Sequence, residues 1–237
     1  MRGALLRLAS LVAALALAAG CDSLPGKPTK SEEYRLPSQV LDFASLYGTN
    51  CAGCHGADGR LGPARPLNDP LYLAVASDED LQQVIARGVP GTTMPAFAIS
   101  EGGTLTDEQI AALVREMRER WGKPSELAGV ELPPYSAPLG DPARGAEVYA
   151  TFCASCHGAD GTARGSIVDP SYLALVSDQA LRSTVIAGRT DLGMPDFRGE
   201  QGATPMTAQQ IADVVAWLAS QRSEFPGQPY VRNARSN

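Results

Sequence analysis

The sequence predicts an all-α fold made of two tandem domains, and two observations carry that prediction. A nine-residue stretch occurs twice, as CAGCHGADG at 51–59 and as CASCHGADG at 153–161. Around each copy the helix signals recur in the same order: an apolar helical stripe before it, then a capped helix, a loop and a second capped helix. A chain of 237 residues accommodates one or two domains, and the repeat favours two.

Each copy contains the pattern Cys-x-x-Cys-His, which is typical of covalent haem attachment. Two thiols at this spacing can bond to the two vinyl groups of one porphyrin, and the adjacent imidazole can ligate its iron. Two copies therefore predict two haem c groups. The predicted attachment residues are Cys51, Cys54, Cys153 and Cys156, and the predicted iron ligands are His55 and His157.

Two other uses of the four cysteines compete with haem attachment. They could form a four-thiolate zinc site, or two local disulfides in an exported protein. A zinc ribbon usually brings its cysteine pairs within about 15 to 20 residues of each other, whereas these pairs lie 102 positions apart. Neither use explains a histidine directly after both pairs, so the pattern favours haem.

Composition narrows the classes of partner and of site. The net charge is −6 and there is no long basic run, which argues against nucleic acid and anionic membrane surfaces as partners. The chain has two histidines and five cysteines, and only Cys21 lies outside the motifs. No histidine remains within the chain for a second axial ligand or for a separate His-based metal or acid/base site.

The N-terminus reads as an export signal. Arg2 and Arg7 precede an apolar run at 8–20, which is too short to span a bilayer. The following Cys21 resembles the cysteine that bacterial lipoproteins acylate, and we expect it to be lipidated; the alternative is cleavage near Ala18 that leaves Cys21 without a role. Asp22 resembles the residue that retains lipoproteins in the inner membrane.

Helix signals bracket each motif. Apolar residues from Gln39 onward predict a helix that runs up to the first motif. Ser77 and Ser177 are expected N-caps of helices that run to Arg87 and Ala187, each ended by a left-handed glycine. The expected left-handed glycines are Gly88 and Gly188, and capping boxes are expected at Thr106 with Gln109 and at Thr207 with Gln210.

A methionine in each half is the expected sixth ligand of the iron. Met94 and Met194 each precede a proline in a loop, and proline biases the preceding residue towards extended backbone. A lone methionine is usually a core residue, but these two occupy the same place in both repeats beside a haem that lacks a ligand. Met117 and Met206 are expected to pack in the core.

The order of helix, motif, capped helix, Met-Pro loop and final helix, run twice, resembles a tandem pair of class I cytochrome c domains over about residues 38–222. The resemblance implies small helical domains with His55 and His157 as proximal ligands and Met94 and Met194 as distal ligands. It also implies a proline carbonyl that orients the proximal histidine. Pro63 or Pro66 could supply it in the first domain, whereas the second has Gly165 and Ser166 in that region.

The aromatic residues of the family's crossing helices match better in the second half than in the first. Gly145 and Tyr149 fit the family's pattern, and Trp217 with Leu218 resembles its C-terminal pair. In the first half Phe43 stands in the place of the glycine, and Trp121 is expected to replace the missing tryptophan one turn later.

The predicted organisation follows from these segments. It comprises a signal peptide at 1–20, a lipid-anchored flexible tether at 21–37, cytochrome c domain 1 at 38–122, a Pro-rich linker at 123–141, cytochrome c domain 2 at 142–222 and a polar tail at 223–237.

A His/Met-ligated haem favours single-electron transfer over bond-making catalysis, because both faces of the iron are occupied. The expected partners are redox proteins: a quinol-oxidising complex or dehydrogenase on one side and a terminal oxidase on the other. The expected location is the periplasmic side of a bacterial inner membrane, through the lipid anchor. The alternatives are a dihaem peroxidase or thiosulfate dehydrogenase, and a permanent electron-accepting subunit of a dehydrogenase.

Overall fold

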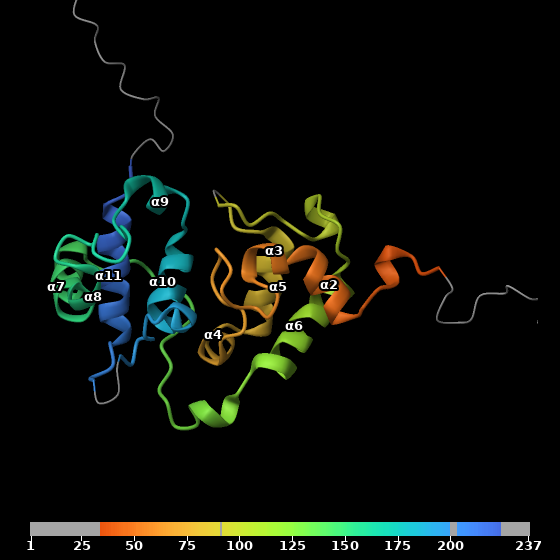
Figure 1. The fold of residues 1–237 in the computed structure, drawn as a ribbon, viewed down its shortest axis with the longest axis horizontal. Helices are drawn as coiled ribbons and strands as arrows, with labels where there is room; N and C mark the ends of the chain where they lie inside the picture. Colours follow the sequence, from red (N-terminus) through yellow and green to blue (C-terminus); the bar gives the residue numbers. More distant parts are fainter. Residues whose placement is uncertain (1–33, 91, 200–202, 224–237) are drawn as a thin grey trace, which may run out of the picture. The chain divides into compact units, whose positions relative to one another are not determined.

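The computed structural model describes residues 34–90, 92–199 and 203–223 (Figure 1). One compact unit ends at Gln39 and the other begins at Val40; the described part of the former contains a short 3-10 helix, Pro37–Gln39. The predicted signal peptide, Cys21 and most of the predicted tether lie outside the described residues, as does nearly all of the predicted tail. Within the described ranges, no helix has the length and apolarity to cross a bilayer.

The unit that begins at Val40 contains two runs of five α-helices in the same order. The first run is α2 (Phe43–Asn50), α3 (Ala52–His55), α4 (Pro70–Val75), α5 (Asp78–Arg87) and α6 (Asp107–Trp121). The second run is α7 (Pro142–Phe152), α8 (Ala154–His157), α9 (Pro170–Ala174), α10 (Asp178–Ala187) and α11 (Ala208–Ser220). Short 3-10 helices occur at Ile99–Glu101, Pro124–Leu127 and Thr190–Leu192. The described residues contain isolated β-bridges but no strand, which confirms the all-α prediction.

The predicted caps begin the helices. Ser77 accepts a hydrogen bond from the backbone N–H of Asp80 at the start of α5, and Ser177 does the same at the start of α10. Thr106 and Thr207 form capping boxes at the starts of α6 and α11. Each satisfied cap removes an orphan N–H and is worth about 1 kcal/mol. Local sequence therefore sets where the helices on both sides of the loops begin.

The prediction that α5 and α10 end at a left-handed glycine was wrong in its detail. Gly88 has φ 65° and ψ −164°, and Gly188 has φ 69° and ψ −166°. The sign of φ is as expected, but ψ lies in the extended region that only glycine adopts readily. The backbone takes this conformation because it leads directly into the methionine loop.

The helix crossing in the second half depends on a glycine. A Cβ atom at Gly145 of α7 would lie 2.0 Å from the carbonyl oxygen of Asp213 in α11, so only glycine permits this approach. One turn later, Tyr149 stacks on Trp217 with ring centroids 4.3 Å apart. α7 and α11 thus pack with their backbones in close contact. Figure 1 shows the two helices side by side.

The first half fills the same crossing with aromatic rings. Phe43 stacks on Tyr47 at 5.2 Å, and Trp121 meets both rings edge-on at 5.5 and 5.3 Å. Trp121 therefore replaces the missing tryptophan of the final helix, as expected.

The cores of the two halves share a boundary along α4 and α10. The buried cluster of the first half includes Ala187 of α10, and that of the second half includes Leu71 of α4. Met117 and Met206 are buried in these clusters, which confirms that they pack in the core. The two halves therefore have adjoining cores.

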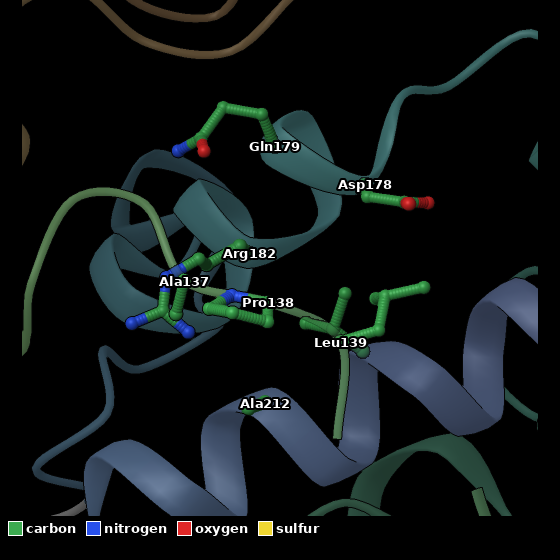
Figure 2. Close-up of a pocket in the computed structure, with 8 residues that line it drawn as sticks. Ala137, Pro138, Leu139, Asp178, Gln179, Arg182 and Ala212 are labelled. Atoms are coloured by element: carbon green, nitrogen blue, oxygen red, sulfur yellow. The ribbon is translucent and has the colours of Figure 1, made fainter. Parts of the chain in front are cut away.

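The linker between the halves packs on both of them. Its Leu127 lies against the core of the second half. The ring centroid of Tyr135 lies 6.5 Å from that of Tyr72 in the first half. Arg182 of α10 donates from Nη2 to the carbonyl oxygen of Pro134 at 2.7 Å and from Nε to that of Tyr135 at 3.1 Å. A pocket of about 210 Å³ lies where the next linker residues meet α10 and α11 (Figure 2). The linker is thus held against both halves by packing and hydrogen bonds.

Candidate haem sites

Each Cys-x-x-Cys-His motif folds as one helical turn. In α3 the backbone N–H of His55 donates to the carbonyl of Cys51 at 2.9 Å, and in α8 that of His157 donates to Cys153 at 2.9 Å. Positions i, i+3 and i+4 share one face of a helix, so both thiols and the imidazole of each motif stand on one face. The two turns have the same backbone pattern.

A tyrosine from the preceding helix anchors the end of each turn. Tyr47 donates its hydroxyl to the carbonyl of Gly56 at 2.8 Å, and Tyr149 donates to the carbonyl of Gly158 at 2.5 Å. Burial raises the pKa of Tyr149 and holds Tyr47 protonated as well, so both hydroxyls remain donors. The aromatic residue predicted before each motif thus fixes the residue after its histidine.

The cysteines remain available for thioether bonds. Cys51, Cys54, Cys153 and Cys156 are free thiols. Burial, with a smaller contribution from the neighbouring thiol, raises the pKa of Cys51 and of Cys153 to about 11. Across the described residues no three His, Cys, Asp or Glu side chains converge to hold a metal ion. The zinc and disulfide alternatives therefore find no support in the geometry.

His55 is held by a backbone carbonyl, although not the predicted one. Its Nδ1 lies 2.8 Å from the carbonyl oxygen of Arg65, so Nδ1 carries the proton and Nε2 keeps its lone pair for iron. The prediction of Pro63 or Pro66 as the acceptor was wrong by one residue. Pro66 restricts Arg65, the residue before it, to extended backbone. As a result the carbonyl of Arg65, and not that of Pro66, points towards His55.

Among the described residues, His157 has no such acceptor. Its Nδ1 is sealed from solvent and makes no hydrogen bond. The loop that would supply the carbonyl contains Gly165 and Ser166, both exposed, as their mismatch to the family pattern suggested. Burial lowers the pKa of both histidines, so each imidazole is neutral and able to bind a metal.

The methionine loops return to the end of the preceding helix. The N–H of Val89 donates to the carbonyl of Met94 at 3.0 Å, and that of Arg189 donates to the carbonyl of Met194 at 3.1 Å. Three residues beyond each methionine, Phe97 and Phe197 donate to carbonyls in the last turn of α5 and α10. Met94 and Met194 themselves are half-buried. Hydrogen bonds on both sides thus fix the backbone of each loop.

Glycine is required where the loop meets the helix. A Cβ atom at Gly88 would lie 2.6 Å from the carbonyl oxygen of Met94, and one at Gly188 would lie 2.6 Å from that of Met194. Any side chain at these positions would push the methionine loop away. The glycines that end α5 and α10 therefore set the position of the loops.

These residues fit a haem on each half. Each half offers paired thiols on a one-turn helix, a neutral imidazole and a thioether on a backbone-anchored loop, which is the donor set of a His/Met-ligated c-type haem. The unpartnered Nδ1 of His157 limits the fit only in the contact that orients the ring. The chemistry of the donors thus agrees with the cofactor that the motifs predict.

Comparison with known families gives a match over most of both halves. The model of the family described as "Cytochrome C oxidase, cbb3-type, subunit III" matches twice, at residues 38–115 and 140–218. The chain belongs to this family. It is a c-type cytochrome with two cytochrome domains, and since c-type cytochromes hold haem covalently on this motif, its two motifs make two haem c groups its cofactors.

Individual relatives are also named as subunits of cbb3-type cytochrome c oxidases. The chain is 32% identical over 152 residues to the Cbb3-type cytochrome c oxidase subunit CcoP of Azospirillum sp. (strain B510), an alignment that covers 57% of this chain and 46% of that one. It is 33% identical over 143 residues to the subunit FixP of Sinorhizobium medicae, covering 54% and 44%. It is 28% identical over 178 residues to FixP of Bradyrhizobium sp. (strain ORS 278), covering 70% and 57%. The chain spans about half the length of these curated relatives.

Three residues that shape the sites had no functional signal of their own in the sequence. Arg65 acts through its carbonyl, and only the proline that follows it could have pointed to it. Arg189 and Asp191 lie just before Met194 and contact the first half. Their importance depends on how the halves pack, which no local pattern encodes.

Proposed function

We propose that the chain carries single electrons between respiratory redox partners, as a dihaem c-type cytochrome that serves a cbb3-type oxidase. In this proposal Cys51, Cys54, Cys153 and Cys156 attach the two haems. His55 and His157 are the proximal ligands, and Met94 and Met194 are the distal ligands. The observation that carries the proposal is the pairing, in both halves, of a helical Cys-x-x-Cys-His turn with a glycine-anchored methionine loop.

The chemistry of the site supports electron transfer. Held by a histidine and a methionine in each half, haem would supply one-electron redox chemistry at a relatively high potential. The chain's own residues would hold this geometry with little movement, since the histidine turn and the methionine loop are both fixed by backbone hydrogen bonds. A histidine and a methionine that both ligate the iron would leave no position for a substrate, so the chain itself would not be an enzyme.

The relatives' names suggest the partner and the location. Those names describe subunits of cbb3-type cytochrome c oxidases, which supports a terminal oxidase as the electron acceptor. The donor in this proposal is a quinol-oxidising complex. An exported chain anchored through a lipid on Cys21, on the periplasmic side of the inner membrane, would be close to both. Domain limits at 38–122 and 142–222 complete the proposal.

Reoxidation by membranes tests the proposed partner. The reduced chain, mixed with membranes that contain a cbb3-type oxidase, is expected to be reoxidised by oxygen within the turnover time of the oxidase. Membranes lacking only that oxidase are the control. Equal rates in both would contradict the proposal. Co-purification from detergent extracts then separates a permanent subunit, which remains with the oxidase, from a mobile carrier, which does not.

A further inference from the structure

The loop that holds His55 makes three contacts with the second half. The backbone N–H of Leu61 donates to Oδ2 of Asp191 at 3.0 Å, and the carbonyl of Gly62 accepts from Nη2 of Arg189 at 3.2 Å. At the end of this loop, Nη2 of Arg65 donates to the carbonyl of Ser183 at 3.4 Å. The same residue, Arg65, gives its own carbonyl to His55. Residues 61–65 therefore belong both to the first haem site and to the contact between the halves.

On the other side, the contact reaches the backbone of Met194. Arg189 and Met194 exchange two backbone hydrogen bonds, N–H to carbonyl at 3.1 Å and 3.0 Å. The side chain of Arg189 forms a fork on Asp191, with Nε to Oδ1 at 3.0 Å and Nη2 to Oδ2 at 3.1 Å. The ion pair is well shielded, because the Asp191 side chain is only 1% exposed. The residues that contact the first half thus carry the backbone of the second distal ligand.

The described residues of the first half show no counterpart of this arrangement. Val89 occupies the place of Arg189, and its N–H pairs with the carbonyl of Met94 in the same way. Its side chain cannot form an ion pair or donate a hydrogen bond. The Arg189–Asp191 pair is therefore an addition to the shared loop, and its outward contacts are to Leu61 and Gly62 of the first half.

We propose that Arg189 and Asp191 clamp the Met194 loop to the 61–65 loop, so that the bond of Met194 to the second haem iron depends on the first half of the chain. Arg189 is a positioning residue in this proposal, since it acts through the backbone of Met194. The inference rests on the proposed ligand set. Because the 61–65 loop also holds His55, hydrogen bonds at both ends of this short loop connect the proposed proximal ligand of the first haem to the loop of the proposed distal ligand of the second.

The clamp predicts weaker Met194 ligation when Arg189 loses its fork. Arg189→Lys keeps the charge but lacks the planar guanidinium fork that holds both carboxylate oxygens of Asp191 while donating to Gly62. In a Met94→His background the sulfur-to-iron absorption of the ferric protein reports Met194 alone, and added imidazole competes with that ligand. We expect Arg189→Lys to tighten imidazole binding roughly fivefold, the effect of one lost hydrogen bond. Arg87→Lys is the matched control, since Arg87 is exposed and pairs only loosely with Glu101 of its own half.

Amide exchange tests the contact from the other side without altering any haem ligand. Leu61 is exposed, and its backbone N–H donates to the carboxylate of Asp191. Asp191→Ala should therefore speed exchange of the Leu61 amide roughly tenfold, while the Leu73 amide, which bonds to Asp69 within the first half, should keep its rate.

The outcomes separate this inference from the proposed function. Unchanged imidazole affinity in Arg189→Lys, or an unchanged Leu61 exchange rate in Asp191→Ala, would overturn the clamp and leave the ligand set intact. Absence of the sulfur-to-iron absorption in the Met94→His protein itself would overturn Met194 as a ligand, and the clamp with it.

Discussion

His55 and His157 occupy equivalent positions on equivalent helical turns, but their surroundings differ. His55 donates from Nδ1 to the carbonyl of Arg65, while Nδ1 of His157 is buried without a partner. A hydrogen bond to Nδ1 makes imidazole a more basic ligand, which favours ferric iron. The repeat therefore duplicates the proposed haem ligands without duplicating the hydrogen bond on the proximal imidazole.

The exposure of an equivalent tyrosine also differs between the two halves. Tyr72 of α4 is 5% exposed, because the linker and α10 cover that helix. Its counterpart Tyr172 in α9 is 48% exposed. Packing between the halves thus buries one copy of a repeated surface and leaves the other accessible. Two similar sequences acquire different environments from their neighbours.

The largest expected effect concerns the helix crossing that the halves build differently. Gly145→Ala should destabilise the protein by about 3 kcal/mol, because its Cβ would overlap the backbone of α11 and cannot be relieved by a side-chain rotation. Gly48→Ala is the matched control in α2, where a Cβ meets nothing within 4 Å; it should be neutral or stabilise by up to about 1 kcal/mol. Urea unfolding of both variants measures the difference. Equal effects would refute the close approach of α7 and α11.

A glycine that the halves share gives the next effect. Gly188→Ala should cost about 2 to 3 kcal/mol, since it combines unfavourable φ with a clash against the Met194 loop. Gly193→Ala has a similar φ of 83° but no atom within 4 Å of its Cβ, so it should cost only about 1 kcal/mol. Urea unfolding measures both costs, and the sulfur-to-iron absorption should weaken in Gly188→Ala alone. A weaker absorption in Gly193→Ala as well would mean that conformational strain, not the close approach, controls the loop.

Acid should affect the second half more than the first. Hydrogen bonds from Arg144 hold the pKa of Asp213 down at about 2, below its ordinary value of 3.8, whereas Ala112 takes its place in the first half. A depressed carboxyl pKa stabilises the fold above the ordinary value, and this stability is lost as pH falls from about 4 towards 2.

Asp213→Asn isolates that contribution. It should cost on the order of 2 kcal/mol at neutral pH, because charge-assisted bonds to Arg144 are lost, and the cost should shrink towards pH 2. Glu147→Gln, at an exposed position of α7, is the control and should leave the pH profile of the unfolding free energy unchanged. A cost for Asp213→Asn that did not vary with pH would contradict the assignment.

The smallest expected effect is on the potential of the first haem. Pro66→Ala frees Arg65 from its extended backbone and should weaken the bond from His55. If this hydrogen bond stabilises the ferric state by about 1 kcal/mol, its loss would raise the reduction potential of that haem by about 40 mV. Pro63→Ala is the control and should leave it unchanged. Redox titration distinguishes the two haems, and a larger shift from Pro63→Ala would restore Pro63 as the orienting residue.

Much of the fold could be predicted from the sequence because its signals are local. Ser77, Thr106 and Thr207 begin helices as expected, since a cap requires only residues three positions apart. The ending of α5 at Gly88 was predicted with the wrong ψ, because that angle depends on where Met94 must lie. Local rules thus place the helices but not the geometry of the loops between them.

The candidate sites were predictable as far as they consist of side chains. The motif cysteines, histidines and loop methionines have patterns that specify chemistry. The carbonyl of Arg65 has none, because every residue carries one. The contact of Arg189 with Gly62 was likewise beyond a sequence pattern, since the two residues meet only through the packing of α4 and α10. The proposed ligands follow from sequence patterns, but the contacts that support them require the structure.

Optical and EPR spectra of the oxidised protein, with Met94→Ala and Met194→Ala beside it, test the central claim most directly. Two low-spin haems are expected, and each variant should lose the sulfur-to-iron absorption of one haem while keeping that of the other. A high-spin, five-coordinate haem in the unmodified protein, or a variant that keeps both absorptions, would contradict histidine and methionine ligation in both halves.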